Sequence, residues 1–194
     1  MATLNKKDAL LRLIRSSIEL FLLRHDDLAT HLVASSASKM AMDLCEKEDP
    51  ILNFWKAHIQ PEYHSLFFTK MRERYNFLKH ADRDWDGSID VEEIRFFNCF
   101  EIVSATIHCE MMYGKLNEWR SMLFFAYVAS KHPDMLKIDK FSDAQRNVLR
   151  ALETWRAGAD IDQFFERQFK LMIDHQDELA LALPNLGFGA DPQH

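Results

Sequence analysis

Apolar side chains recur every three or four residues along much of this chain, and this spacing constrains the fold more than any other feature. It holds for Leu10, Ile14 and Ile18 near the amino terminus, and later for a longer series: Phe96, Phe100, Val103, Ile107 and Met111. An α-helix turns once in about 3.6 residues, so such positions share one helical face. Only five glycines and five prolines occur in 194 residues, and strand and turn signals form no regular series. The sequence therefore predicts an all-α helical bundle.

Capping and breaking residues set the limits of the expected helices. We expect helices near residues 6–23, 27–45, 63–78, 91–113, 117–133, 142–155 and 161–172. Asp26 or Asp27 can cap the second helix, whose small side chains, such as Ala34 and Ala37, would let another helix approach closely. We assign residues 1–132 to the main bundle, 133–183 to C-terminal helices packed on the same core, and 184–194 to a flexible tail.

Charge and composition narrow the function classes. The formal net charge of −6 argues against broad binding to phosphate backbones, which depends on clustered Lys and Arg. Cys45, Cys99 and Cys109 have no CxxC spacing, so we expect reduced thiols rather than zinc ligands or disulfides. No apolar run approaches the roughly 20 residues of a membrane span, and the amino-terminal segment lacks a signal-peptide core. We expect a cytoplasmic protein with no membrane partner.

Oxygen-bearing side chains between residues 82 and 93 follow the spacing of a calcium-binding loop. With Asp82 at the first position, the remaining ligand positions are filled by Asp84, Asp86, Ser88, Asp90 and Glu93. Gly87 stands where the loop turns sharply. This arrangement resembles an EF-hand loop, in which short carboxylates surround a hard cation and a final glutamate binds it with both oxygens. The resemblance implies a site for Ca²⁺ or another divalent cation.

The acidic loop has a second interpretation that needs no metal. Trp85 and Ala81 depart from the usual EF-hand pattern, and the chain has no second loop of this kind with which the first could pair. Acidic residues are also favourable at the start of a helix, where they compensate unpaired backbone N–H groups. Asp90 or Glu92 could therefore serve as a helix cap within an acidic turn.

A different pattern lies just before this loop. Arg74, Asn76 and His80 resemble the R-x4-6-H motif of HEPN ribonucleases, and the first two expected helices resemble the hairpin that opens many HEPN proteins. The resemblance implies a dimer that cleaves RNA without metal. His80 would act on the ribose hydroxyl or the leaving oxygen, Arg74 would stabilise phosphate charge, and Asn76 would orient the site. Arg72 is an alternative partner for His80 because it shares a helical face with Asn76 and His80, and His80 with Lys79 could simply stabilise the helix end.

The run N-F-L-K-H-A-D-R-D also resembles a recurrent motif of an uncharacterised bacterial all-α family. That resemblance implies that Asn76, Lys79, His80, Asp82 and Asp84 act together, but it supplies no activity. We rank first an interaction or regulatory module with a calcium site in the 82–93 loop. The alternative is a HEPN-type ribonuclease or toxin-like RNA-cleaving protein, and RNA is a partner only in that case. A homodimer or another protein partner fits both, and the sequence leaves open whether the protein is an enzyme.

Overall fold

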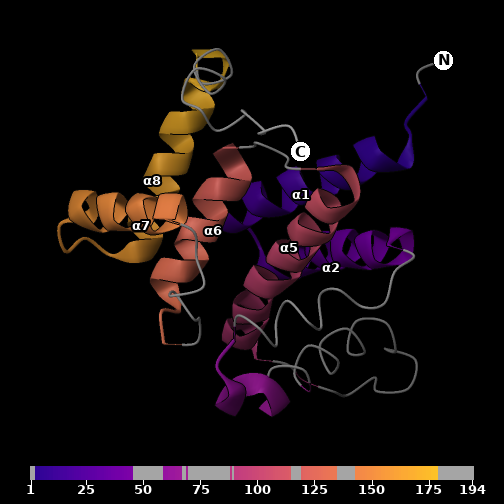
Figure 1. Ribbon diagram of the computed structural model, residues 1–194, viewed down its shortest axis with the longest axis horizontal. Helices are drawn as coiled ribbons and strands as arrows, with labels where there is room; N and C mark the ends of the chain where they lie inside the picture. Colours follow the sequence, from indigo (N-terminus) through magenta and orange to yellow (C-terminus); the bar gives the residue numbers. More distant parts are fainter. Residues whose placement is uncertain are drawn as a thin grey trace.

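The computed structural model describes residues 3–45, 59–66, 69, 88, 90–114, 119–134 and 143–178. These residues form helices and contain no β-strand, so the all-α prediction is confirmed for them. The elements are α1 (Lys6–Leu22), α2 (Asp27–Leu44), the short 3-10 helix η1 (Pro61–Tyr63), α5 (Val91–Tyr113), α6 (Trp119–Lys131), α7 (Asp143–Arg156) and α8 (Ile161–Asp174). Figure 1 shows α7 and α8 on the side of α6 that faces away from α2. Most of the helix expected at 63–78 lies outside the described residues.

Side chains of short polar residues fix where the helices begin. Asp26 is the N-cap of α2, and its carboxylate accepts a hydrogen bond from the backbone N–H of Ala29 at 2.8 Å. Asn5 and Asp160 cap α1 and α8 in the same way. Each of these bonds satisfies a backbone donor that the first helical turn would otherwise leave unpaired. The structure thus decides between the two aspartates proposed for the start of α2.

The pair formed by α2 and α5 has the most extensive contact among the described helices. Small side chains on α2 make this possible, since Ala34, Ala37 and Ala41 are all fully buried. Without long side chains between them, the two backbones can approach closely. The expectation that the small side chains of α2 let another helix approach closely is confirmed, but the opposite side of α2 is exposed at Leu32 and Ser36.

The buried residues of α5 do not form the single apolar face that its sequence predicts. Met111 of the predicted stripe is 56% exposed, whereas Phe97, Asn98 and Glu101, which lie off that stripe, are buried. The reason is that α5 contacts α1, α2 and α6, so it buries side chains in several directions. A helix enclosed on several sides does not need one narrow apolar stripe. The carboxyl end of α5 is at Gly114, whose φ of 82° is readily adopted by glycine.

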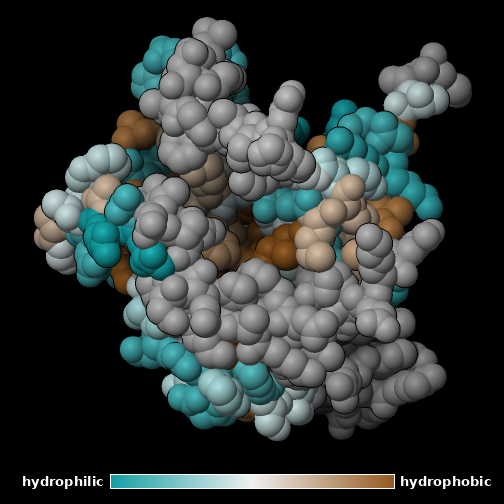
Figure 2. Space-filling view, viewed as in Figure 1, coloured by the Kyte–Doolittle hydropathy of each residue, from teal (hydrophilic) through white to brown (hydrophobic). Residues whose placement is uncertain are grey.

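The hydrophobic core is continuous from α1 to α8. Phe21 of α1 packs edge-on against Phe124 and Tyr127 of α6, with ring centroids 5.3 Å apart in both pairs. Tyr127 in turn packs against Phe165 of α8 at 5.4 Å. Such edge-to-face contacts add to the stabilisation that burial itself provides. Figure 2 shows apolar side chains near the middle of this face, where α1, α5 and α6 lie close together. No helix in the described part of the chain is long and apolar enough to cross a membrane.

The close approach of α2 to its neighbours yields a test of packing. We expect Ala37→Leu to lower the free energy of unfolding by about 1–3 kcal/mol, because a larger side chain must force packed neighbours apart. The adjacent Ser36 is exposed, so Ser36→Leu is the matched control and should change stability by less than about 0.5 kcal/mol. Urea unfolding of both variants measures the difference. Equal effects would contradict the packing described for α2.

Candidate functional site

The sequence-predicted site residues fall mostly outside the part of the chain that the structure describes. Ser88, Asp90 and Glu93 are within it. The others, including the proposed ribonuclease residues, are not: Arg72, Arg74, Asn76, His80, Asp82, Asp84 and Asp86. The described residues also contain no group of three or more His, Cys, Asp or Glu side chains arranged to hold a metal. Both sequence hypotheses therefore stay predictions.

The carboxyl end of the acidic loop continues directly into α5. Asp90 is the N-cap of this helix, and its carboxylate accepts a hydrogen bond from the backbone N–H of Glu92 at 2.9 Å. The predicted capping role of Asp90 is thus confirmed. Glu93 lies in the first turn and is half-buried, whereas Glu92 is exposed. Consequently, the last proposed cation ligand belongs to the first turn of the longest described helix.

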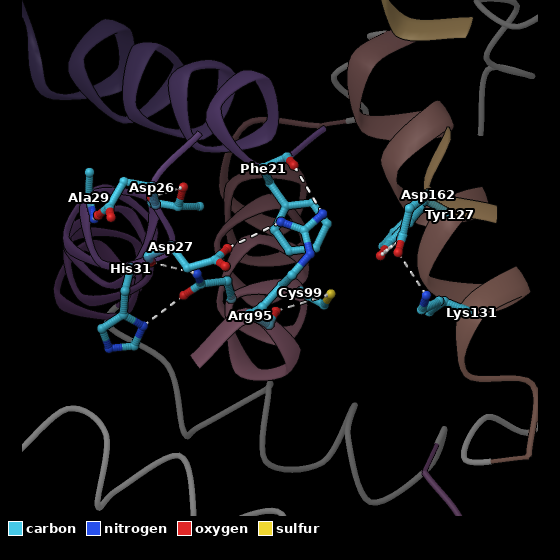
Figure 3. A network of polar contacts seen from close by, with 12 residues as sticks. Phe21, Asp26, Asp27, Ala29, His31, Arg95, Cys99, Tyr127, Lys131 and Asp162 are labelled. Carbon is cyan, nitrogen blue, oxygen red and sulfur yellow. Dashed lines mark hydrogen bonds and ion pairs between the residues drawn. The ribbon is translucent and has the colours of Figure 1, made fainter. Parts of the chain in front are cut away.

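Arg95 lies two residues after Glu93 and connects α5 to α1 and α2. Its guanidinium donates to the Asp27 carboxylate at 3.2 Å and to the Phe21 backbone carbonyl at 3.4 Å. It also stacks over the Phe21 ring, 4.2 Å from the centroid. A planar guanidinium can make all three contacts together, while a lysine ammonium cannot. Arg95 therefore fixes the end of α1 and the beginning of α2 relative to α5 (Figure 3).

Asn98, one turn further along α5, makes a second connection to α2. Its side-chain nitrogen donates to the Asp27 backbone carbonyl at 3.0 Å, and its oxygen lies 2.8 Å from His31 Nδ1. With the amide oriented in this way, its oxygen is an acceptor, so His31 Nδ1 carries the hydrogen. His31 is only 2% exposed. This burial suits a role in joining the helices rather than contact with a substrate in solvent.

A third polar connection joins α6 to α8. The Asp162 carboxylate accepts hydrogen bonds from Tyr127 Oη at 2.7 Å and from Lys131 Nζ at 2.9 Å. Burial alone would raise the pKa of Asp162, but these two donors outweigh it and lower that pKa. Asp162 is therefore held as a carboxylate. Nearby, burial lowers the pKa of His132 to about 4, so this imidazole is neutral at physiological pH.

The Cys99 thiol is not activated for chemistry. Cys99 is buried, and its thiol donates to the Arg95 carbonyl at 3.6 Å. Burial strongly raises the pKa of Cys99 despite the nearby Arg95 charge, and a neutral thiol is a poor nucleophile and metal ligand. Cys109 is also buried, and all three cysteines are free of disulfides. The expectation of reduced thiols stays a prediction.

These polar groups cluster at the junction of α1, α2 and the start of α5. Figure 3 shows Arg95 directed toward Asp27 across the helices and His31 one turn further along α2, with Tyr127 and Asp162 at the neighbouring α6–α8 contact. Sequence analysis did not single out Arg95 or Asn98. The only available signal was their polarity within a strongly apolar helix. Arg95, Asn98 and Asp162 each bind groups of a neighbouring helix, so these contacts are best suited to holding helix ends in place.

Comparisons with known proteins found no match to any family model, curated protein or solved structure. The resemblances to an EF-hand loop and to HEPN proteins therefore rest on the quoted residues alone.

The double role of Asn98 predicts a measurable loss of stability. Asn98→Leu keeps a similar volume but leaves the His31 ring and the Asp27 carbonyl without their partner on α5. An unsatisfied buried polar group costs about 1–3 kcal/mol, so we expect a loss of at least that size in urea unfolding. Asn147 is exposed on α7, and Asn147→Leu is the control, with little change expected. A neutral Asn98→Leu would show that this connection contributes nothing to the stability.

Proposed function

We propose that the chain is an interaction or regulatory module in which a divalent cation, Ca²⁺ above all, binds the 82–93 loop and acts through α5. The observation that supports this proposal most directly is the position of Glu93. It lies in the first turn of α5, two residues before Arg95 and five before Asn98. Arg95 and Asn98 are the side chains that connect α5 to α1 and α2. A change at Glu93 would therefore reach the helix junction within two turns.

The capping bond of Asp90 is compatible with a bound cation. In EF-hand loops the ninth position, which Asp90 occupies, often contacts the cation through a water molecule rather than directly. Its carboxylate could therefore keep its hydrogen bond to the N–H of Glu92. Glu93, at the twelfth position, would supply both carboxylate oxygens. Cation binding would draw the first turn of α5 toward the loop and would change the contacts that Arg95 and Asn98 make with α1 and α2.

Exposed apolar side chains near the same junction support an interaction role. Leu28 and Leu32 on α2 are 39% and 55% exposed, and Val91 at the start of α5 is 56% exposed. Leu28 follows Asp27 directly, and Val91 lies one turn before Arg95. The Asp27–Arg95 ion pair thus joins the two helix ends that carry these residues. A movement of α5 against α2 would change how these side chains are presented to a protein partner.

Calorimetric titration of the chelator-treated full chain tests the cation site. We expect Ca²⁺ to bind in the micromolar range and more tightly than Mg²⁺, because a flexible multidentate oxygen site suits the larger ion. Glu93→Gln removes the bidentate ligand and should weaken binding at least tenfold. Glu92→Gln is the matched control, since it changes an exposed neighbour of equal charge, and it should bind as the unaltered chain does. Trp85 fluorescence gives a second readout from within the loop.

Two outcomes would contradict this proposal. Absence of binding at millimolar Ca²⁺ would leave the loop as an acidic turn capped by Asp90. Equal weakening in Glu92→Gln and Glu93→Gln would indicate a diffuse charge effect instead of a coordinated ion. RNA cleavage that resists EDTA and disappears in His80→Ala would instead establish the ribonuclease interpretation.

A further inference from the structure

Glu101 occupies an unusual place for an acidic residue. It lies near the middle of α5, is only 6% exposed, and forms a hydrogen bond with the Ser38 side chain of α2. No other Asp or Glu among the described residues is buried. Acidic side chains are seldom buried unless a positive charge or a metal compensates them. The burial of Glu101 therefore requires an explanation.

The described groups around Glu101 offer it no buried positive partner. No lysine or arginine is buried among the described residues. The helices that contact α5 are α1, α2 and α6, and α1 buries no titratable side chain. The titratable groups buried on the other two and on α5 itself are His31 of α2, Tyr127 of α6, and Cys99, His108 and Cys109 of α5. Among these, only the histidines could become positive, and only by gaining a proton at lower pH.

We propose that the contact between α2 and α5 is a pH-sensitive joint, which is tight while Glu101 is protonated and is weakened when this carboxyl group ionises. The neutral acid can share a hydrogen bond with the Ser38 hydroxyl inside an apolar contact. The carboxylate keeps the same partner but must also give up its hydration, with no buried positive charge among the described residues to compensate it. The joint is the most extensive helix contact in the described part of the chain, so its strength affects the whole bundle.

The ionisation of Glu101 in the folded chain is expected near neutral pH. Burial raises the pKa of Glu101 from its ordinary value of 4.5 to about 7, although the Ser38 hydrogen bond lowers it in part. Below pH 4.5, the folded and unfolded chains both hold the proton, and this group has no effect on stability. Between pH 4.5 and 7, the unfolded chain ionises while the folded chain stays protonated, so stability falls as pH rises. Above pH 7, both are ionised and the loss is complete.

Urea unfolding of the full chain between pH 4.5 and 8 tests the joint. From pH 4.5 to pH 8, we expect the unfolding equilibrium constant of the unaltered chain to increase on the order of a hundredfold more than that of Glu101→Gln. This variant keeps the size of the side chain but cannot ionise. Glu92→Gln, an exposed substitution on the same helix, should keep the full pH dependence. Any contribution of His31 or His108 would be common to all three chains, so the comparison isolates Glu101.

A spectroscopic measurement keeps the proposal testable even where Glu101→Gln does not fold. Selective ¹³C labelling of the glutamate carboxyl carbons should reveal one resonance that titrates near pH 7 in the folded chain. The same pH dependence of unfolding in the unaltered chain and in Glu101→Gln would overturn the proposal. So would a set of glutamate resonances that all titrate below pH 5.5.

Discussion

Arg95 and Asn98 of α5 both bind Asp27, the first residue of α2, and the arrangement of the described helices depends on this contact. Three chain segments meet there: the end of α1, the start of α2 and the second turn of α5. The Asp27 carbonyl accepts from Asn98, and the Phe21 carbonyl accepts from Arg95. Polar side chains from a distant part of the sequence thus bind two backbone carbonyls at the helix junction, and this fixes α5 against the α1–α2 pair.

Local features of the fold could be predicted from the sequence because short-range physics determines them. The limits of α2 follow from the Asp26 cap, and the end of α5 follows from Gly114. The small face of α2 was visible as a run of alanines and serines. These features depend on residues within one or two turns of each other, and they were predicted correctly.

The long-range polar contacts could not be predicted in this way. Asp27 and His31 are four residues apart, a spacing that suggests a local pair, yet the bonds described here connect them to Arg95 and Asn98 on α5. Their partners lie 68 and 67 residues away in the sequence. Periodicity likewise failed to indicate that Glu101 is buried, because burial on α5 depends on which helices surround it. The predicted cation ligands and ribonuclease residues before Ser88 belong to the segment outside the described structure.

The position of Phe21 has a consequence for how the protein folds. Its ring is shared, since Arg95 of α5 stacks on it while Phe124 and Tyr127 of α6 pack against it at 5.3 Å. Phe21 therefore contributes to the interior that α1 shares with both α5 and α6. Separate unfolding of the C-terminal helices would leave a large aromatic surface of α1 open to water. We therefore expect the described helices to unfold as one cooperative unit. A fragment that ends after α5 would lack Phe124 and Tyr127, which pack on Phe21 in the full chain.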